Sequence, residues 1–188
     1  MRVEASVLAA GRGRRMGGAK HLLPLAGVPI AERVVRALRA TSAWRVSIVL
    51  RPDDADGHAL AERCGVTATP AESADEGRAA SIRAAVRAAA ADSAGILFAL
   101  ADQPFLDSAD FERLLSAFRA EPRGIVRARY GDAPGSPVLF ARAFFAELLE
   151  LRGREGGRAV IARHPELVRA VALPVEHGRD LDTPEDWP

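Results

Sequence analysis

The chain reads Leu8-Ala9-Ala10-Gly11-Arg12-Gly13-Arg14-Arg15-Met16-Gly17-Gly18-Ala19-Lys20 at the end of an apolar run over residues 3–10, which has the length of a strand. The four glycines allow the backbone to turn tightly and to direct its N–H groups at an anion. The segment also carries three arginines and one lysine, with no acidic residue. It therefore predicts a phosphate-binding loop at the carboxyl end of the first strand of a sheet. The alternative is a solvated basic turn.

Two common phosphate-binding motifs do not fit this loop. The dinucleotide-binding pattern G-x-G-x-x-G requires glycine where Met16 stands. The Walker A pattern requires lysine directly after Gly18 and serine or threonine next, but the chain continues Ala19-Lys20-His21. The mismatch at Met16 also disfavours a dinucleotide-dependent oxidoreductase.

Strand-like and helix-like segments alternate along the rest of the chain. This alternation predicts an α/β fold with a mainly parallel, Rossmann-like sheet and helices on both faces. No repeat, linker or block of like charge divides the sequence, so we expect a single domain over residues 1–188. The predicted strands cover residues 3–10, 46–50, 66–69, 96–101, 125–128, 137–140 and 168–173, and the predicted helices cover 30–40, 53–64, 78–91, 108–119 and 141–151.

The composition excludes several classes of protein. The net charge is +1, so no global field attracts nucleic acid or a membrane surface. Cys64 is the one cysteine, which excludes an internal disulfide framework and any multi-cysteine metal site. There is no basic-then-apolar leader and no apolar run of membrane-spanning length, so we expect a cytoplasmic protein.

Lys20 is the one lysine among the 26 lysine and arginine residues. Codon bias toward arginine explains the scarcity of lysine, but it makes the retained lysine informative. A compact ammonium group on a flexible stem reaches a phosphate as a point charge, which the planar guanidinium of arginine does not. We therefore expect Lys20 to lie exposed in a cleft and to bind phosphate.

Acidic residues follow the strands at two places where a metal ion could bind. Asp102 comes directly after the apolar run 96–101, and its carboxylate is placed to coordinate Mg²⁺ beside a phosphate. Near the other end stands Gly178-Arg179-Asp180-Leu181-Asp182-Thr183-Pro184-Glu185-Asp186. Alternate residues of an extended chain point in opposite directions, so one of Asp180 and Asp182 should meet the metal. Glu185 and Asp186 look instead like acids in the first turn of a terminal helix.

The loop resembles the signature of the MobA-like nucleotidyltransferases, a group that contains the molybdenum cofactor guanylyl- and cytidylyltransferases. The pattern L-A-A-G-x-G-x-R-M-G-x-x-K continues without a gap into Leu22-Leu23-Pro24-Leu25-Ala26-Gly27-Val28-Pro29. Asp102 stands at the family's G-D-x-P position, with Ala101 in place of glycine. The closing D-x-D-T-P-E-D segment resembles the family's last motif.

The resemblance implies roles for particular residues. It assigns nucleotide binding to the loop and to one serine near Glu76 and Gly77; these residues are Leu8, Ala9, Ala10, Gly11, Gly13, Arg15, Lys20 and Ser81. It gives Arg15, Lys20 and Asp102 catalytic roles, and it makes Asp102 and Asp182 the ligands of Mg²⁺, with Asp180 behind them.

Acceptor binding is implied for Gly135, Pro137 and Arg158. Here the chain departs from the family pattern, because Ser136 replaces histidine, Arg154 stands at an acidic position and Gly157 replaces alanine. Acceptor identity is therefore the least constrained part of the resemblance.

The resemblance implies transfer of a nucleotide from a nucleoside triphosphate to the phosphate of a molybdopterin-type acceptor, with release of pyrophosphate. Ala10 gives L-A-A-G, which is closer to the cytidylyltransferases than to the guanylyltransferases, so CTP is the expected donor. A molybdoenzyme or its maturation chaperone would receive the product. The alternatives are another nucleotide or phosphorylated acceptor within the family, and a non-catalytic chaperone that binds molybdenum cofactor.

Overall fold

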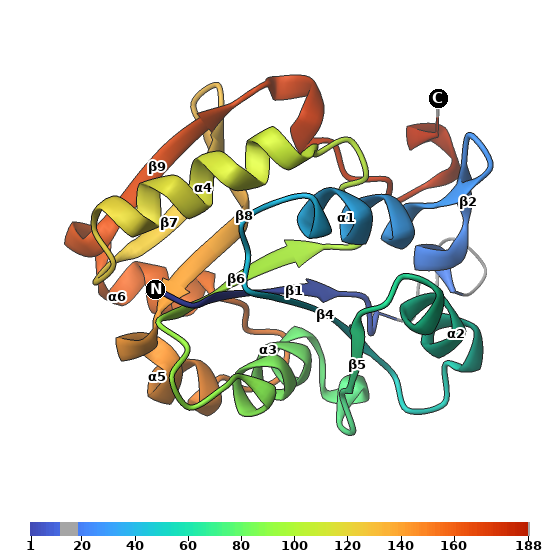
Figure 1. Ribbon diagram of the computed structural model, residues 1–188, viewed down its shortest axis with the longest axis horizontal. Helices are drawn as coiled ribbons and strands as arrows, with labels where there is room; N and C mark the ends of the chain where they lie inside the picture. The colour runs from blue at the N-terminus through green and yellow to red at the C-terminus, as the bar shows by residue number, and fades with distance from the viewer. Residues whose placement is uncertain (12–18, 188) are drawn as a thin grey trace.

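The computed structural model describes residues 1–11 and 19–187 and contains one large sheet (Figure 1). Its strands lie in the order β5-β4-β1-β6-β8-β7-β9, and all are parallel except β8, which is antiparallel to both β6 and β7. The predicted mainly parallel α/β fold is confirmed. The strands are β1 (Val3–Leu8), β4 (Arg45–Leu50), β5 (Thr67–Pro70), β6 (Gly95–Leu100), β7 (Ile125–Tyr130), β8 (Ala133–Ala141) and β9 (Val168–Leu173).

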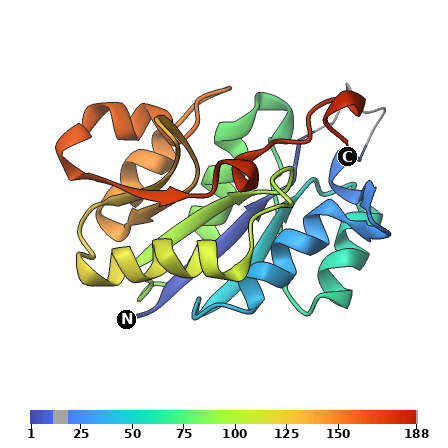
Figure 2. The same cartoon turned by 90° about the horizontal axis from the view of Figure 1, so that it is seen from above.

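Helices cover both faces of the sheet, as Figures 1 and 2 show. The helices α1 and α4 lie on one face, and α3 and α5 lie on the other. In α1, Ile30, Val34 and Leu38 recur at helical spacing and are fully buried, so this stripe fixes the helix on the sheet. The bounds are α1 (Ile30–Arg39), α2 (Ala55–Arg63), α3 (Arg78–Ala88), α4 (Ser108–Ala120), α5 (Phe145–Glu150) and α6 (Arg158–Arg163).

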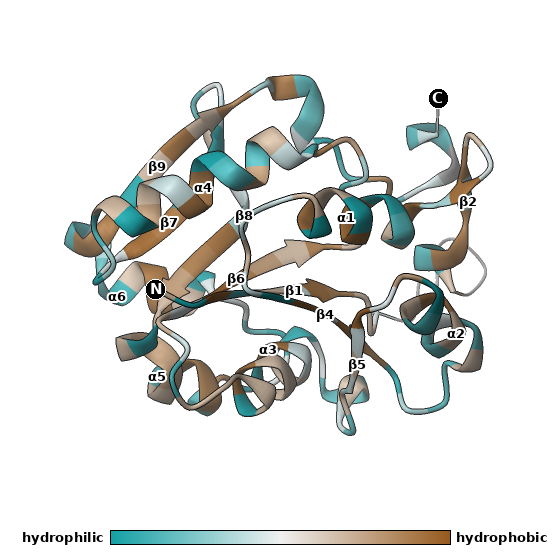
Figure 3. Cartoon of the chain, viewed as in Figure 1, coloured by the Kyte–Doolittle hydropathy of each residue, from teal (hydrophilic) through white to brown (hydrophobic). Residues whose placement is uncertain are grey.

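The core lies on both sides of the central strands. β1 and β6 are buried along almost their whole length, as expected for parallel strands that helices cover on both faces. Figure 3 shows the strands mainly in the colours of apolar residues, whereas the helices carry polar residues on their outer surfaces. None of the helices within the described residues is long and apolar enough to cross a membrane.

Some local elements differ from the sequence-based expectation. The predicted helix over 141–151 is divided into a 3₁₀ turn (Arg142–Phe144) and the short helix α5, because β8 continues as far as Ala141. A two-stranded hairpin, β2 (Pro24–Leu25) with β3 (Val28–Pro29), and the helix α6 were not predicted. β8 is antiparallel because only Gly131 and Asp132 separate it from β7, and so short a connection permits only a hairpin.

The segment after β9 returns to the carboxyl ends of the central strands. It passes through a 3₁₀ turn (Val175–Gly178), and the backbone N–H of Leu181 then donates to the carbonyl oxygen of Asp102 at 2.9 Å. Leu181 is fully buried in a small cluster with Leu25 and Ile30. This packing brings the last acidic motif beside the end of β6.

Candidate active site

Lys20 joins two acidic residues that lie far from it in the sequence. Its Nζ is 2.7 Å from Oδ2 of Asp102 and 2.6 Å from Oδ1 of Asp182. Lys20 begins a 3₁₀ turn (Lys20–Leu22), Asp102 follows β6, and Asp182 lies on the segment that returns from β9. The structure thus brings together three of the residues singled out from the sequence.

Lys20 is less exposed than expected. Its side chain is 12% exposed, because the two carboxylates cover the ammonium group. Burial alone would lower the pKa of Lys20, but the hydrogen bonds and negative charges of Asp102 and Asp182 outweigh burial and raise it. The group is therefore a permanent cation at neutral pH, and the expectation of an exposed lysine in the cleft was wrong in this respect.

Asp182 contacts Lys20, whereas Asp180 forms no ion pair with a described residue. Burial and the negative charges of Asp102 and Asp182 raise the pKa of Asp180. This arrangement agrees with the alternation expected of an extended segment, because only one of the two acids, Asp182, contacts Lys20.

A cavity of about 780 Å³ opens beside Asp102. This volume lies within the usual range of small-molecule sites. Five residues with predicted roles line it, namely Leu8, Ala10, Gly11, Ser81 and Asp102. Ala9 does not line the cavity; it is buried, and its N–H donates to the carbonyl oxygen of Val49. Gly13 and Arg15 lie outside the described residues.

The start of α3 and a later loop form one wall of the cavity. Gly77 precedes α3 with a φ of +116°, and a Cβ there would lie 2.6 Å from the carbonyl oxygen of Gly153. The N–H of Ala79 donates to that same oxygen at 3.2 Å. Glycine is therefore required at position 77 by both conformation and space. Arg154, which the sequence placed on the acceptor side, lines this cavity together with Arg78, which was not singled out from the sequence.

The three residues expected to bind the acceptor do not line this cavity among the described residues. Pro137 is buried, and Gly135 packs against a ring, since a Cβ on it would lie 2.7 Å from a ring carbon of Tyr130. Arg158 is exposed at the start of α6. The close approach of Tyr130 thus explains the glycine at position 135 without a ligand.

The last acids of the chain have different partners. Oδ2 of Asp186 accepts hydrogen bonds from the N–H groups of Asp182 and Thr183 and from the hydroxyl of Thr183. Asp186 therefore shapes the turn that presents Asp182. Glu185 is exposed, as expected for a residue of a terminal turn, although the turn is 3₁₀ (Pro184–Asp186) rather than α-helical.

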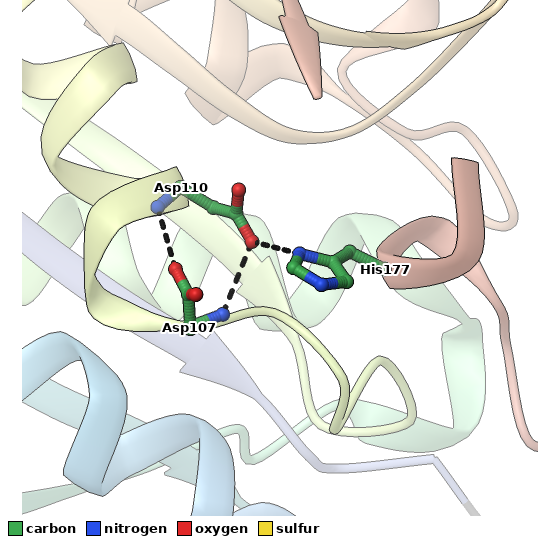
Figure 4. Close-up of side chains that lie close together, drawn as sticks. All are labelled: Asp107, Asp110 and His177. Carbon is green, nitrogen blue, oxygen red and sulfur yellow. Dashed lines mark hydrogen bonds and ion pairs between the residues drawn. The ribbon is translucent and has the colours of Figure 1, made fainter. Parts of the chain in front are cut away.

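Asp107, Asp110 and His177 form a second cluster with ligand-type side chains (Figure 4). Asp107 caps α4 by accepting from the N–H of Asp110, and Asp110 accepts from the N–H of Asp107. The buried carboxylate of Asp110 also contacts Nδ1 of His177 at 2.6 Å. These groups are already engaged in capping the helix and in holding the returning segment on it, and none of them lines the cavity.

Asp102 and Asp182 fit a divalent cation better than this cluster does. Their carboxylates converge on one positive charge, the ammonium of Lys20, at the carboxyl end of a buried strand. Hard cations such as Mg²⁺ and Mn²⁺ prefer carboxylate oxygens. The donor set therefore suits a divalent metal beside the cavity.

Comparison with known proteins identifies close relatives. Residues 5–168 match the model of the MobA-like NTP transferase domain. The chain is 35% identical to a probable molybdenum cofactor guanylyltransferase of Opitutus terrae, over 91% of this chain and 84% of that protein. It is 31% identical to the purine catabolism protein PucB of Bacillus subtilis, over 96% of this chain and 91% of that protein.

A solved structure, that of Rv0371c from Mycobacterium tuberculosis, has the same fold. It superposes with a TM-score of 0.85 at 29% identity, and the match covers 100% of this chain and 96% of that one. The same protein has also been solved in complex with manganese, and that structure gives a TM-score of 0.81 at 26% identity.

Proposed function

The chain belongs to the MobA-like NTP transferase family and is a nucleotidyltransferase, and we propose that it transfers CMP from CTP to the phosphate of a molybdopterin-type acceptor. The observation that carries this proposal is the bridge from Lys20 to Asp102 and Asp182 at the edge of a cavity of nucleotide size. Membership of the family supports the type of reaction. The choice of CTP is based on Ala10, where the sequence is closer to the cytidylyltransferases than to the guanylyltransferases.

The cavity has the features that a nucleoside triphosphate requires. Gly11 offers backbone without a side chain, and no atom of residues 1–11 or 19–187 lies within 4 Å of where its Cβ would be. Ser81, on α3, offers a hydroxyl to the ribose or base. Arg78 and Arg154 add positive charge to the wall, which suits a polyanionic ligand.

In the proposed reaction, an acceptor phosphate oxygen attacks the α-phosphorus and pyrophosphate leaves. The attacking group is already an anion, so the protein needs no general base. Its task is to align the two substrates and to neutralise the charge that develops on the phosphates. Lys20 supplies a fixed positive charge for this purpose, and Arg15 is proposed to supply a second.

Asp102 and Asp182 would hold Mg²⁺, which neutralises phosphate charge and polarises the reacting phosphoryl group when it is bound. Lys20 already holds both carboxylates near each other in the structure. The manganese complex of Rv0371c supports a divalent metal in a protein of this fold.

The choice of base rests on Ala10. Its methyl group lies at the loop on which a base must sit, and a pyrimidine needs less room there than a purine. Because Ala10 lines the cavity and yet is only 4% exposed, the effect should be small. GTP is the second candidate, which is favoured by the name of the Opitutus relative.

Competition between CTP and GTP for one enzyme sample, with molybdopterin as acceptor, tests the choice of base. We expect kcat/KM to favour CTP, and we expect Ala10→Gly to narrow that preference by ~1–3 kcal/mol without faster turnover of CTP. A ratio that favours GTP would replace the cytidylyl assignment with a guanylyl one. A nucleotidyltransferase should release pyrophosphate only when the acceptor is present, whereas a non-catalytic chaperone should release none.

A further inference from the structure

Two arginines beyond the cavity, Arg127 on β7 and Arg158 at the start of α6, have no acidic partner among residues 1–11 and 19–187. Nε of Arg127 is buried without a hydrogen-bond partner. Burial and the neighbouring charge of Arg158 lower the pKa of Arg127. Even partial removal of a charge from water is costly unless an opposite charge lies near it. None of the described carboxylates compensates in this way for the half-buried charge of Arg127.

Arg127 shares a face of the sheet with the residues that line the cavity. Leu8 pairs with Leu100 across β1 and β6, and both line the cavity. Phe98, two residues before Leu100, pairs with Val138 on β8, and Val138 pairs with Arg127. Cross-strand neighbours and alternate residues of one strand point to the same face. Arg127 therefore lies on the cavity face, two strands away from β6.

The loop before α6 connects the arginine pair to the cavity wall. A Cβ on Gly157 would lie 2.7 Å from the ring of Phe140, so the start of α6 rests on the same face of the sheet. A Cβ on Gly156 would lie 3.3 Å from Cδ of Arg78, which lines the cavity. The positive charges thus continue from the nucleotide cavity across β8 to Arg127.

We propose that Arg127, together with Arg158, binds an oxyanion group of the acceptor and thereby selects which acceptors are used. The planar guanidinium group forms paired hydrogen bonds with such oxygens, which favours phosphate-like groups over neutral ones. This inference rests on the proposed function for the identity of the acceptor, but the oxyanion site itself can be tested without turnover.

The first test measures steady-state kinetics of Arg127→Met with a matched control. Arg113→Met removes a charge from an exposed residue of α4, on the opposite face of the sheet. We expect Arg127→Met to raise KM for the acceptor by ~10- to 100-fold, the loss typical of one hydrogen bond to a charged group. KM for the nucleotide should stay within about twofold, and Arg113→Met should match wild type.

The second test follows the melting temperature in inorganic phosphate at constant ionic strength, with saturating CTP and Mg²⁺ to fill the nucleotide cavity. Phosphate should raise the Tm of wild type and of Arg113→Met, because a ligand that binds the folded state stabilises it. Arg127→Met should lose this rise. Without phosphate, its Tm should equal wild type or exceed it by about 2–4 °C, since the substitution removes an unpaired, half-buried charge.

The outcomes separate this inference from the proposed function. Arg158→Gln, at an exposed position, should repeat the loss of phosphate stabilisation if Arg127→Met folds poorly. A wild type that phosphate does not stabilise, or an Arg127→Met that keeps the rise, would overturn the oxyanion site. If no acceptor supports turnover but the rise is lost in Arg127→Met, the proposed function fails and the oxyanion site stands.

Discussion

The two halves of the sheet balance their charges differently. On the side of β1 and β6, the ammonium of Lys20 lies between two carboxylates that hold it. On the side of β7 and β8, Arg127 and Arg158 lie close to each other, and the structure as described places no carboxylate against them. Lys20 and Arg127 are both partly buried, but their surroundings raise the pKa of Lys20 and lower the pKa of Arg127.

The two halves of the sheet thus differ in how their cationic side chains are paired. In the first half, two ion pairs within the chain hold Lys20 between Asp102 and Asp182. In the second half, Arg127 has no carboxylate partner among the described residues. On the proposals above, the fixed charge of Lys20 would serve catalysis and the unpaired charge of Arg127 would serve recognition of the acceptor.

Removal of Lys20 should have the largest effect. Lys20→Ala should lower kcat by ~10²- to 10³-fold, as for other preorganised groups that stabilise charge in a transition state. Its Tm should fall by only a few degrees, because the two acids can regain water at the cavity edge. Steady-state kinetics measures the change in kcat, and thermal unfolding measures the change in Tm. Arg36→Ala, which breaks a surface pair with Glu32, serves as the control for loss of an ion pair.

Lys20→Arg sharpens the same test, because arginine keeps the charge but changes its shape. We expect low activity, since a planar fork cannot sit between two carboxylates as a compact ammonium does. Full activity in this variant would contradict the argument from the single lysine.

Loss of either acidic partner should have the next largest effect. Asp102→Asn and Asp182→Asn should each raise the metal concentration for half-maximal activity by at least ~10-fold, because the loss even of a group that only supports a metal ligand typically costs that much. Titration with Mg²⁺ and Mn²⁺ measures this shift. Glu185→Gln, at an exposed neighbouring acid, should leave the titration unchanged. An unaltered titration in Asp182→Asn would move the second ligand to Asp180.

Two glycines, one in each half, give the smallest expected effects. The ring of Tyr130 lies between Gly135 and Gly178, and a Cβ on either would approach it to 2.7 Å. Gly135→Ala should therefore cost about 1–3 kcal/mol of stability through overpacking. A Cβ on Gly11 would meet no atom of the described residues within 4 Å, so Gly11→Ala should keep its Tm and weaken nucleotide binding instead. Thermal unfolding and nucleotide titration of both variants test these expectations. A Gly135→Ala variant as stable as wild type would contradict the packing role of Gly135.

Local patterns in the sequence predicted most of the fold. The apolar spacing over residues 30–38 predicted α1, and the continuous apolar run of β6 predicted a central strand, because each segment is buried in the way its period requires. The predicted helix over 108–119 corresponds to α4, which Asp107 caps. The antiparallel turn from β7 into β8 was not predicted, since it depends on a two-residue link whose geometry the apolar pattern does not encode.

The candidate site was predictable only in part. Strand ends meet at one edge of a parallel sheet, so the approach of Lys20 to Asp102 followed from the order of elements. The position of Asp182 depends on the burial of Leu181 against Leu25 and Ile30, a contact between distant segments that no local pattern reveals. Arg127 could not be singled out among 26 basic residues, because its significance lies in a missing partner.

The three residues of the Lys20 bridge are synthesised at widely separated times. Asp102 lies 82 positions after Lys20, and Asp182 lies 162 positions after it. A ribosome that adds ~5–20 residues per second completes β6 several seconds before it reaches Asp182. During that interval the growing chain can contain the glycine-rich loop, Lys20 and Asp102 without the second carboxylate. A chain cut short before residue 182 would lack the second carboxylate that contacts Lys20 and that we propose as a metal ligand.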